Sequence, residues 1–226
     1  MLLAAGGPDS FIWWDWIGRH TADITSAVTT HLRLTGIAVG LGLALSVPLA
    51  LAARRYRRTQ GVILGITGTL YTIPSLALFF LLGPLTGYTG IVTAEIALVS
   101  YTLLILIRNI VAGLDSVAAD VREAARGMGY APVRQLVRVE IPLALPGIMA
   151  GLRIATVTTI GLVTVAAVIG QGGLGQLILD DGLQRDFTTP VVVGTVLSVA
   201  LAFVADLALL GVQRLLTPWS RTHRAS

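Results

Sequence analysis

Charged residues are rare in this chain, and one internal stretch holds many of those that could do chemistry. Residues 121–142 read VREAARGMGYAPVRQLVRVEIP and contain four arginines and two glutamates. Elsewhere the chain is strongly apolar: 54% of its 226 residues are hydrophobic and only 12% are charged. Soluble domains average about a quarter charged residues. The composition therefore indicates a membrane protein that carries one polar segment.

Several kinds of chemistry are excluded by residue type. Cysteine is absent, so neither a disulfide framework nor a thiolate metal site is possible. All sixteen basic residues are arginine, and a chain without lysine cannot form a GxxxxGK[ST] phosphate-binding loop. The three histidines lie near the ends, and no HExxH or serine–histidine pairing is found. We therefore expect no enzyme, no metal and no cofactor in this chain.

A glycine-rich run imitates a nucleotide-binding fingerprint. Residues 170–175, GQGGLG, satisfy GxGxxG, but that pattern indicates a dinucleotide site only between a strand and a helix. Here it follows an apolar span. We expect close backbone packing at an outer gate instead, with a flexible loop as the alternative. The gate residues would be Gly170, Gly172, Gly173 and Gly175.

Three charged residues interrupt apolar stretches. Asp206 lies well inside the last of these stretches and should face protein or water, because an unpaired charge in lipid is costly. A hydrogen bond to a neighbouring span is as plausible as a role in transport. Glu95 lies near the outer interface and could extend its carboxylate to it, so it is the weaker candidate for a functional role. Arg153 should lie near the cytoplasmic end of its own stretch.

The elements that carry these residues are five candidate spans, each close to the roughly 20 apolar residues that cross a bilayer. Pro74 breaks the second span near its middle. Residues 11–32 are not expected to insert, because Asp15, Arg19, His20 and Asp23 argue against it. Trp13, Trp14 and Trp16 suggest an interfacial anchor. The spans are Leu34–Ala53, Gly61–Gly83, Ile91–Ile107, Gly147–Ile169 and Pro190–Val212.

Arginine counting predicts the orientation of the spans, since positive residues accumulate in cytoplasmic loops. With five spans, only Arg19 and Arg185 fall in loops on one side. The N-terminus is then outside, and residues 121–142 and the C-terminus are cytoplasmic. The eleven arginines on the cytoplasmic side are Arg54, Arg55, Arg57, Arg58, Arg122, Arg126, Arg134, Arg138, Arg214, Arg221 and Arg224.

The polar stretch itself predicts two short amphipathic helices joined by a glycine elbow. Asp115 or Ser116 should cap a first helix over Val117–Met128. Gly127 and Gly129 should end it, with Gly129 at positive φ. Pro132 suits the first turn of a second helix. Pro142 and Pro146 should end that helix before the fourth span.

These residues resemble the signature of permease subunits of ATP-binding cassette importers. The signature is EAA, three residues, Gly, nine residues and I-x-L-P; here Glu123-Ala124-Ala125 is followed by Gly129 and by VEIP at 139–142. The spacing is kept, and Val139 and Ile141 are conservative departures. The resemblance implies that Glu123, Ala124, Ala125, Gly129, Ile141 and Pro142 couple the spans to an ATPase subunit, which binds ATP and Mg²⁺.

Further stretches resemble permeases of glycine betaine, carnitine and choline importers. They are RLTGIAVGLGLALSVPLAL (33–51), YTIPSLALFFLL (71–82), EIPLALPGIMAGLRIA (140–155) and VIGQGGLGQLI (168–178). Tyr71 replaces the usual Gln before TIPS. The resemblance implies an all-α, MetI-like membrane fold in the bacterial inner membrane. It also implies two ATPase copies, an extracytoplasmic binding protein and a second permease, either identical or homologous.

Such importers carry compatible solutes, and a quaternary ammonium is held by aromatic faces and negative potential rather than by hydrogen-bond donors. Interrupted helices often line such sites. Packing between helices is the simpler role for any single aromatic residue. The pathway residues expected on this basis are Tyr71, Pro74, Phe79, Tyr101 and Asp206.

We expect one permease domain over 1–226. It comprises an outer N-terminal segment (1–32), a helical core (34–213) that includes the coupling loop (115–146), and a cytoplasmic tail (214–226). Two alternatives stay open: an importer of amino acids such as methionine, and an ion-coupled carrier. One buried aspartate and no internal repeat argue against the carrier. The high isoelectric point could suggest nucleic acid as a partner, but a nucleic-acid-binding domain is not built from long uncharged apolar runs. We therefore expect membrane lipid and not nucleic acid.

Overall fold

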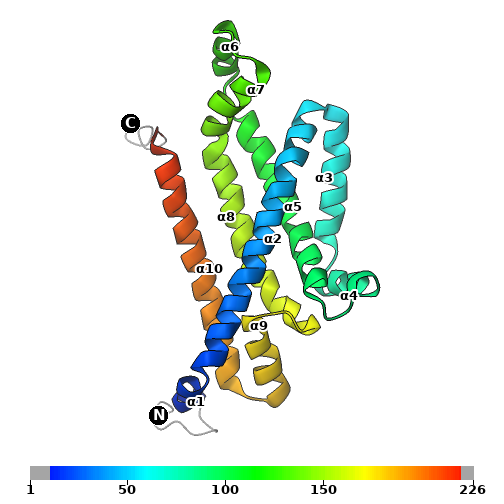
Figure 1. The fold of residues 1–226 in the computed structure, drawn as a ribbon, viewed down its shortest axis with the longest axis vertical. Coiled ribbons are helices and arrows are strands. Elements are labelled where there is room, and N and C mark those ends of the chain that lie inside the picture. The colour runs from blue at the N-terminus through cyan, green and yellow to red at the C-terminus, as the bar shows by residue number, and fades with distance from the viewer. Residues whose placement is uncertain (1–10, 220–226) are drawn as a thin grey trace. The chain divides into compact units, whose positions relative to one another are not determined.

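The computed structural model describes residues 11–219, and within that range the chain is helical with no strand. Figure 1 shows the order of the helices. Four helical stretches are long and apolar enough to cross a membrane: α2 (Thr21–Arg55), α5 (Ile91–Asp115), the run Pro132–Ile169 that contains α8 (Ile141–Val165), and α10 (Thr188–Leu216). These agree with four of the five predicted spans.

The second predicted span is a broken pair of helices. Two residues separate α3 (Arg57–Thr72) from α4 (Ser75–Thr86), and the second of them, Pro74, precedes the first residue of α4. The pair makes a fifth candidate span only if both helices are counted together. The break at Pro74 was predicted, because a proline disfavours helical backbone in the residue before it.

The first span is longer than predicted. α2 begins at Thr21 rather than Leu34, and it is preceded by the short helix α1 (Trp14–Arg19). Its early turns are held by specific contacts: His31 is fully buried and its Nε2 lies 3.0 Å from the carbonyl oxygen of Ile160. Trp16 is buried between His20 and Phe187, so it packs inward, whereas Trp14 is exposed.

Contacts divide the chain into two compact units. The first unit comprises residues 1–39, 73–99 and 157–204, and it holds α1, α4, α9 (Leu174–Gln176) and the short segments η2 (Ala166–Ile169), η3 (Leu177–Gly182) and η4 (Leu183–Arg185). Its core includes Leu34, Phe79, Leu98, Ile160, Val163 and Leu174. The long helices contribute to both units.

The second unit comprises residues 40–72, 100–156 and 205–226. Its core is formed by Ala50, Ala53, Leu106, Ile107, Ile110, Leu114, Ala144 and Ala155. Small residues let the helix backbones approach each other: a Cβ on Gly147 would lie 3.1 Å from Cα of Gly113. Packing of this kind stabilises helix pairs in lipid, where the hydrophobic effect contributes little.

Candidate functional site

The polar stretch folds into two short helices joined by a glycine elbow, as predicted. α6 (Ala119–Gly127) ends in a Schellman motif, in which Tyr130 N–H donates to the Ala125 carbonyl (3.1 Å) and Gly129 N–H to that of Arg126 (2.9 Å). Gly129 has a φ of 80°, a left-handed conformation that glycine adopts without strain. Pro132 begins α7 (Pro132–Gln135).

The predicted N-cap of the first helix is wrong. α6 begins at Ala119 after Ala118, with no side-chain cap. Ser116 Oγ donates instead to the carbonyl of Gly113 at 2.7 Å, and Asp115 is the last residue of α5. Asp115 accepts a hydrogen bond from Arg54, so both polar side chains serve the end of α5 rather than the start of α6.

Pro142 and Pro146 do not end the second helix, which is a further correction. α7 continues through the π-helical turn η1 (Leu136–Glu140) directly into α8. The Ile141 N–H bonds to the Leu136 carbonyl, five residues back, just before the first proline. Pro142, which has no N–H to donate, directly follows this π turn, where the regular i→i−4 hydrogen-bond pattern is already interrupted. Pro146 is accommodated inside α8.

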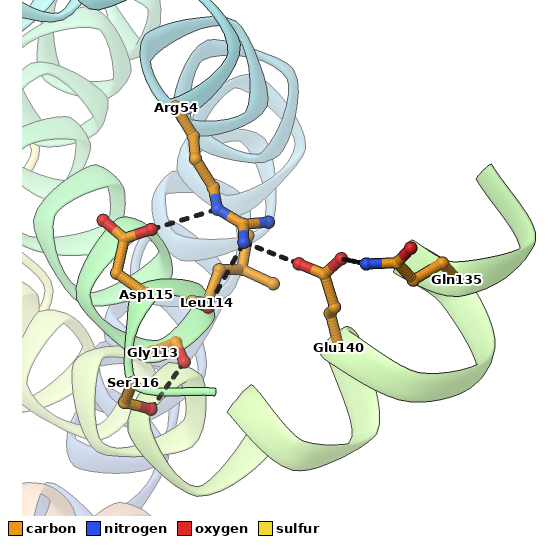
Figure 2. Close-up of polar contacts among 7 residues, drawn as sticks. All are labelled: Arg54, Gly113, Leu114, Asp115, Ser116, Gln135 and Glu140. Carbon is orange, nitrogen blue, oxygen red and sulfur yellow. Dashed lines mark hydrogen bonds and ion pairs between the residues drawn. The ribbon is translucent and has the colours of Figure 1, made fainter. Parts of the chain in front are cut away.

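A network centred on Arg54 ties this segment to the ends of α2 and α5 (Figure 2). Arg54 Nε donates to Asp115 Oδ1 over 3.0 Å, and its Nη2 lies 2.6 Å from Glu140 Oε2. Gln135 Nε2 donates to the other oxygen of Glu140 at 2.8 Å. The side chain of Glu140 is only 8% exposed, so its charge is compensated by Arg54 and Gln135.

Sequence reasoning missed this network. Glu140 sits inside the predicted signature, but its partner Arg54 is distant in sequence, and the arginine bias indicates only that Arg54 lies in a cytoplasmic loop. One signal in the sequence could have indicated it. Glu140 lies directly before an apolar span, and a carboxylate buried there needs a cation or hydrogen-bond donors nearby.

The elbow segment, defined here as residues 119–140, exposes apolar side chains around its glycines. Relative exposure is 69% for Met128, 73% for Val133 and 55% for Val137. Glu123 and Ala124 are exposed, whereas Ala125 is buried. Glu123 forms no ion pair with any residue in 11–219. Exposed apolar groups beside a rigid turn suit contact with another protein.

The predicted pathway residues are divided between the two units. Tyr71 and Tyr101 form an edge-to-face pair with ring centroids 5.9 Å apart, and Tyr101 is buried while Tyr71 is partly exposed. Pro74 and Phe79 belong to the first unit, and Phe79 is buried at its core. Asp206 pairs with Arg153 through two hydrogen bonds, of 2.8 and 2.7 Å.

The residues of the GQGGLG run are tightly packed at three positions. A Cβ on Gly173, which has a φ of 50°, would lie 2.8 Å from His31 N. Added Cβ atoms on Gly172 and Gly175 would overlap the backbones of Ala167 and Thr164. Gly170 also has positive φ but faces open space. Close backbone approach is therefore present, and the gate role stays a prediction.

The Glu95 carboxylate is enclosed by the protein. Both of its carboxylate oxygens are buried, and neither has a hydrogen-bond partner among the described residues. Within residues 11–219, no three histidine or acidic side chains are grouped so as to hold a metal ion.

Comparison with known proteins gives concordant matches. Residues 36–218 match the family described as "Binding-protein-dependent transport system inner membrane component". The chain is 40% identical over 199 residues to the osmoprotectant import permease protein OsmW of Salmonella typhimurium, which covers 86% of this chain and 92% of that protein. It is 39% identical over 188 residues to the choline transport system permease protein OpuBB of Bacillus subtilis, covering 83% and 86%.

A solved structure shares the fold. One form of the inward-facing MetNI methionine ABC transporter superposes with a TM-score of 0.77, covering 88% of this chain and 98% of that one at 24% identity. At that identity the likeness concerns the fold alone, and it agrees with the expected all-α, MetI-like architecture.

Proposed function

Because the chain belongs to the family of binding-protein-dependent transport system inner membrane components, we propose that it is the permease subunit of an ATP-driven importer of osmoprotectants. Candidate solutes are glycine betaine, choline, carnitine and proline betaine. The observation that carries the proposal is the 40% identity with an osmoprotectant permease over most of both chains.

The elbow segment is the proposed contact with the ATPase. Its support is geometric: a left-handed glycine fixes the turn, and Met128, Val133 and Val137 expose apolar groups around it. Arg54 and Glu140 connect the segment to α2 and α8, so a movement of the elbow would be passed to the spans. Glu123, Ala124, Ala125, Gly129, Ile141 and Pro142 remain the proposed coupling residues.

The proposed assembly contains two ATPase subunits, an extracytoplasmic binding protein and a second permease. ATP and Mg²⁺ would be bound by the ATPase, since this chain lacks the lysine of a phosphate-binding loop. The N-terminus would lie outside the cell and the C-terminus in the cytoplasm. The arginine bias supports this orientation.

The solute pathway is proposed to include Tyr71 and Tyr101. Their edge-to-face pair supplies two aromatic rings at the site of an interrupted helix, and aromatic faces attract quaternary ammonium groups. For Phe79 we propose a packing role, which its burial supports. Asp206 already has a cationic partner in Arg153, so its proposed role is structural.

One alternative substrate class is supported by the fold. The superposition with a methionine transporter shows that the same fold is used for amino acids. An ion-coupled carrier is less well supported, because Asp206 is engaged by Arg153 rather than left for an ion.

The deciding experiment is uptake by the reconstituted transporter, with its ATPase and binding protein, of labelled glycine betaine, choline and methionine. We expect ATP-dependent uptake of a quaternary ammonium solute and none of methionine. Uptake of methionine alone would replace the proposed substrate class, and uptake without ATP would overturn the proposed mechanism.

A further inference from the structure

A cavity of about 550 Å³ in the second unit has walls rich in arginine. It lies between the C-terminal end of α2 and the elbow segment. Arg54 and Arg55 come from the last turn of α2, and Arg122 and Arg126 come from α6. Against these four guanidinium groups, the wall contains one carboxylate, that of Glu140. The cavity therefore carries a net positive charge.

Most of this charge is not neutralised within the described part of the chain. Arg54 is paired with Glu140 and Asp115. Arg55, Arg122 and Arg126 have no carboxylate within ion-pair distance among residues 11–219. Three arginines without an ion pair thus line one cavity. A guanidinium group is a planar fork of donors that binds phosphate oxygens in pairs.

The position of the cavity along α2 indicates where its ligand comes from. Leu51 lines the same wall one turn before Arg54 and Arg55, so the cavity sits where the apolar span gives way to charge. That level of a span lies at the lipid headgroups. Basic pockets at this depth on the cytoplasmic side bind anionic lipid headgroups.

We propose that this cavity binds the phosphate of an anionic phospholipid, such as phosphatidylglycerol, from the leaflet at the C-terminal end of α2. Its apolar wall, formed by Leu51 and Leu136, suits the start of an acyl chain, which free phosphate does not need. The exposed residues offered to the ATPase, Met128, Val133 and Val137, do not line the cavity. The lipid and the ATPase therefore use different faces of the elbow segment.

A bound lipid would connect two elements of the transporter. Its phosphate would contact the end of α2 on one side and α6 on the other, and so hold the elbow segment in place. This inference rests on the proposed function for its membrane placement and assigns a lipid to the coupling region.

The test uses the assembled transporter with a photoactivatable phosphatidylglycerol, and with phosphatidylcholine as the neutral probe. The double variant Arg122→Gln/Arg126→Gln removes two cavity arginines. The matched control, Arg134→Gln/Arg138→Gln, removes two arginines of the same segment that do not line the cavity. The variant Arg122→Lys/Arg126→Lys keeps the positive charge, so it distinguishes loss of charge from a general effect of substitution on folding.

We expect the Gln pair in the cavity to weaken phosphatidylglycerol binding by about thirtyfold, from about 1 kcal/mol for each arginine near an anionic surface. The control and the Lys pair should retain most of the binding. Equal labelling of wild type and the cavity variant would overturn the proposal. So would displacement of the lipid by inorganic phosphate, or loss of the ATPase with unchanged lipid labelling.

The proposed function is tested by solute uptake, whereas the lipid site is tested by lipid labelling. Wild-type transporter that retains phosphatidylglycerol but takes up no osmoprotectant in vesicles would overturn the function and leave the lipid site standing. Uptake with no selective lipid labelling would overturn the lipid site alone.

Discussion

Arg153 in α8 and Asp206 in α10 face each other as a bidentate ion pair, with Arg153 Nε 2.8 Å from Oδ1 and Nη2 2.7 Å from Oδ2. The two residues are 53 positions apart, and each lies within an apolar helix. Only 11% of the most apolar window of α10 is buried. The pair is therefore a polar attachment of α10 to α8 in a region where either charge alone would be costly.

The first prediction follows from this pair. Asp206→Leu leaves Arg153 unpaired and should lower the amount of folded protein in the membrane, and Arg153→Leu should act similarly. The double variant should recover more folded protein than either single one, because no unpaired charge remains. The measurement is size-exclusion chromatography of detergent extracts. Additive losses in the double variant would contradict the pairing.

The second prediction concerns the turn at Gly129. Its φ of 80° makes any side chain strained, by roughly 1–2 kcal/mol. Gly129→Asp adds a charge as well and should abolish uptake while the protein stays in the membrane. Gly127→Ala is the matched control, because Gly127 is helical and also faces open space. Arg134→Gln should retain much activity, and Glu123→Ala should be intermediate.

Uptake and co-purification of the ATPase, at matched membrane levels, test this second prediction. Full transport by Gly129→Asp would show that the elbow segment is a passive loop.

The third prediction compares the two anions held by Arg54. Glu140 is nearly buried, whereas the side chain of Asp115 is 55% exposed. Glu140→Gln should therefore impair uptake strongly and Asp115→Asn only slightly, since a buried ionic partner contributes about 3 kcal/mol or more and an exposed one little. Uptake relative to ATP hydrolysis should fall in Glu140→Gln. Similar uptake by both variants would mean that the network does not position the elbow.

The fourth prediction concerns glycines in the first unit. Gly175→Ala should reduce thermal stability, because its Cβ would overlap the backbone of Thr164. Gly161→Ala is the control, because a Cβ added at Gly161 would meet open space. Thermal unfolding of the purified protein measures both. A Gly175→Ala variant as stable as the control would show that this packing is readily relieved.

The fifth prediction concerns orientation. The natural chain has no cysteine, so single cysteines report without background. A cysteine at Gln60 should be protected from impermeant thiol reagents in intact cells, and one at Gln184 should be labelled. The reverse pattern would invert the topology and remove the elbow segment from the ATPase side.

Local signals predicted much of the fold. Apolar length located the spans, Pro74 located the break between α3 and α4, and Gly129 and Pro132 located the elbow. Each of these rests on the backbone preferences of a residue or on a run of similar residues. Such signals can be read from a few neighbouring residues, without knowledge of distant contacts.

Features that depend on distant partners were not predictable. The charged residues of the 11–32 segment made it look interfacial, but α2 begins at Thr21. Its early turns are held by His31, whose partner is the carbonyl of Ile160, 129 residues away. Asp115 looked like a helix cap because its ion pair with Arg54 could not be seen. In both places a tertiary contact, rather than the local preference of the residue, determines the structure.

The π-helical turn η1 fixes which way the elbow segment faces. A π turn inserts one residue relative to an α-helix, so everything before it is rotated by about 100° around the helix axis. Val133 and Arg134 thus owe their direction to a phase shift located at Leu136–Glu140. Removing one residue there would restore a regular helix. The same side chains would then point in a different direction around the helix axis, with no change in their chemistry.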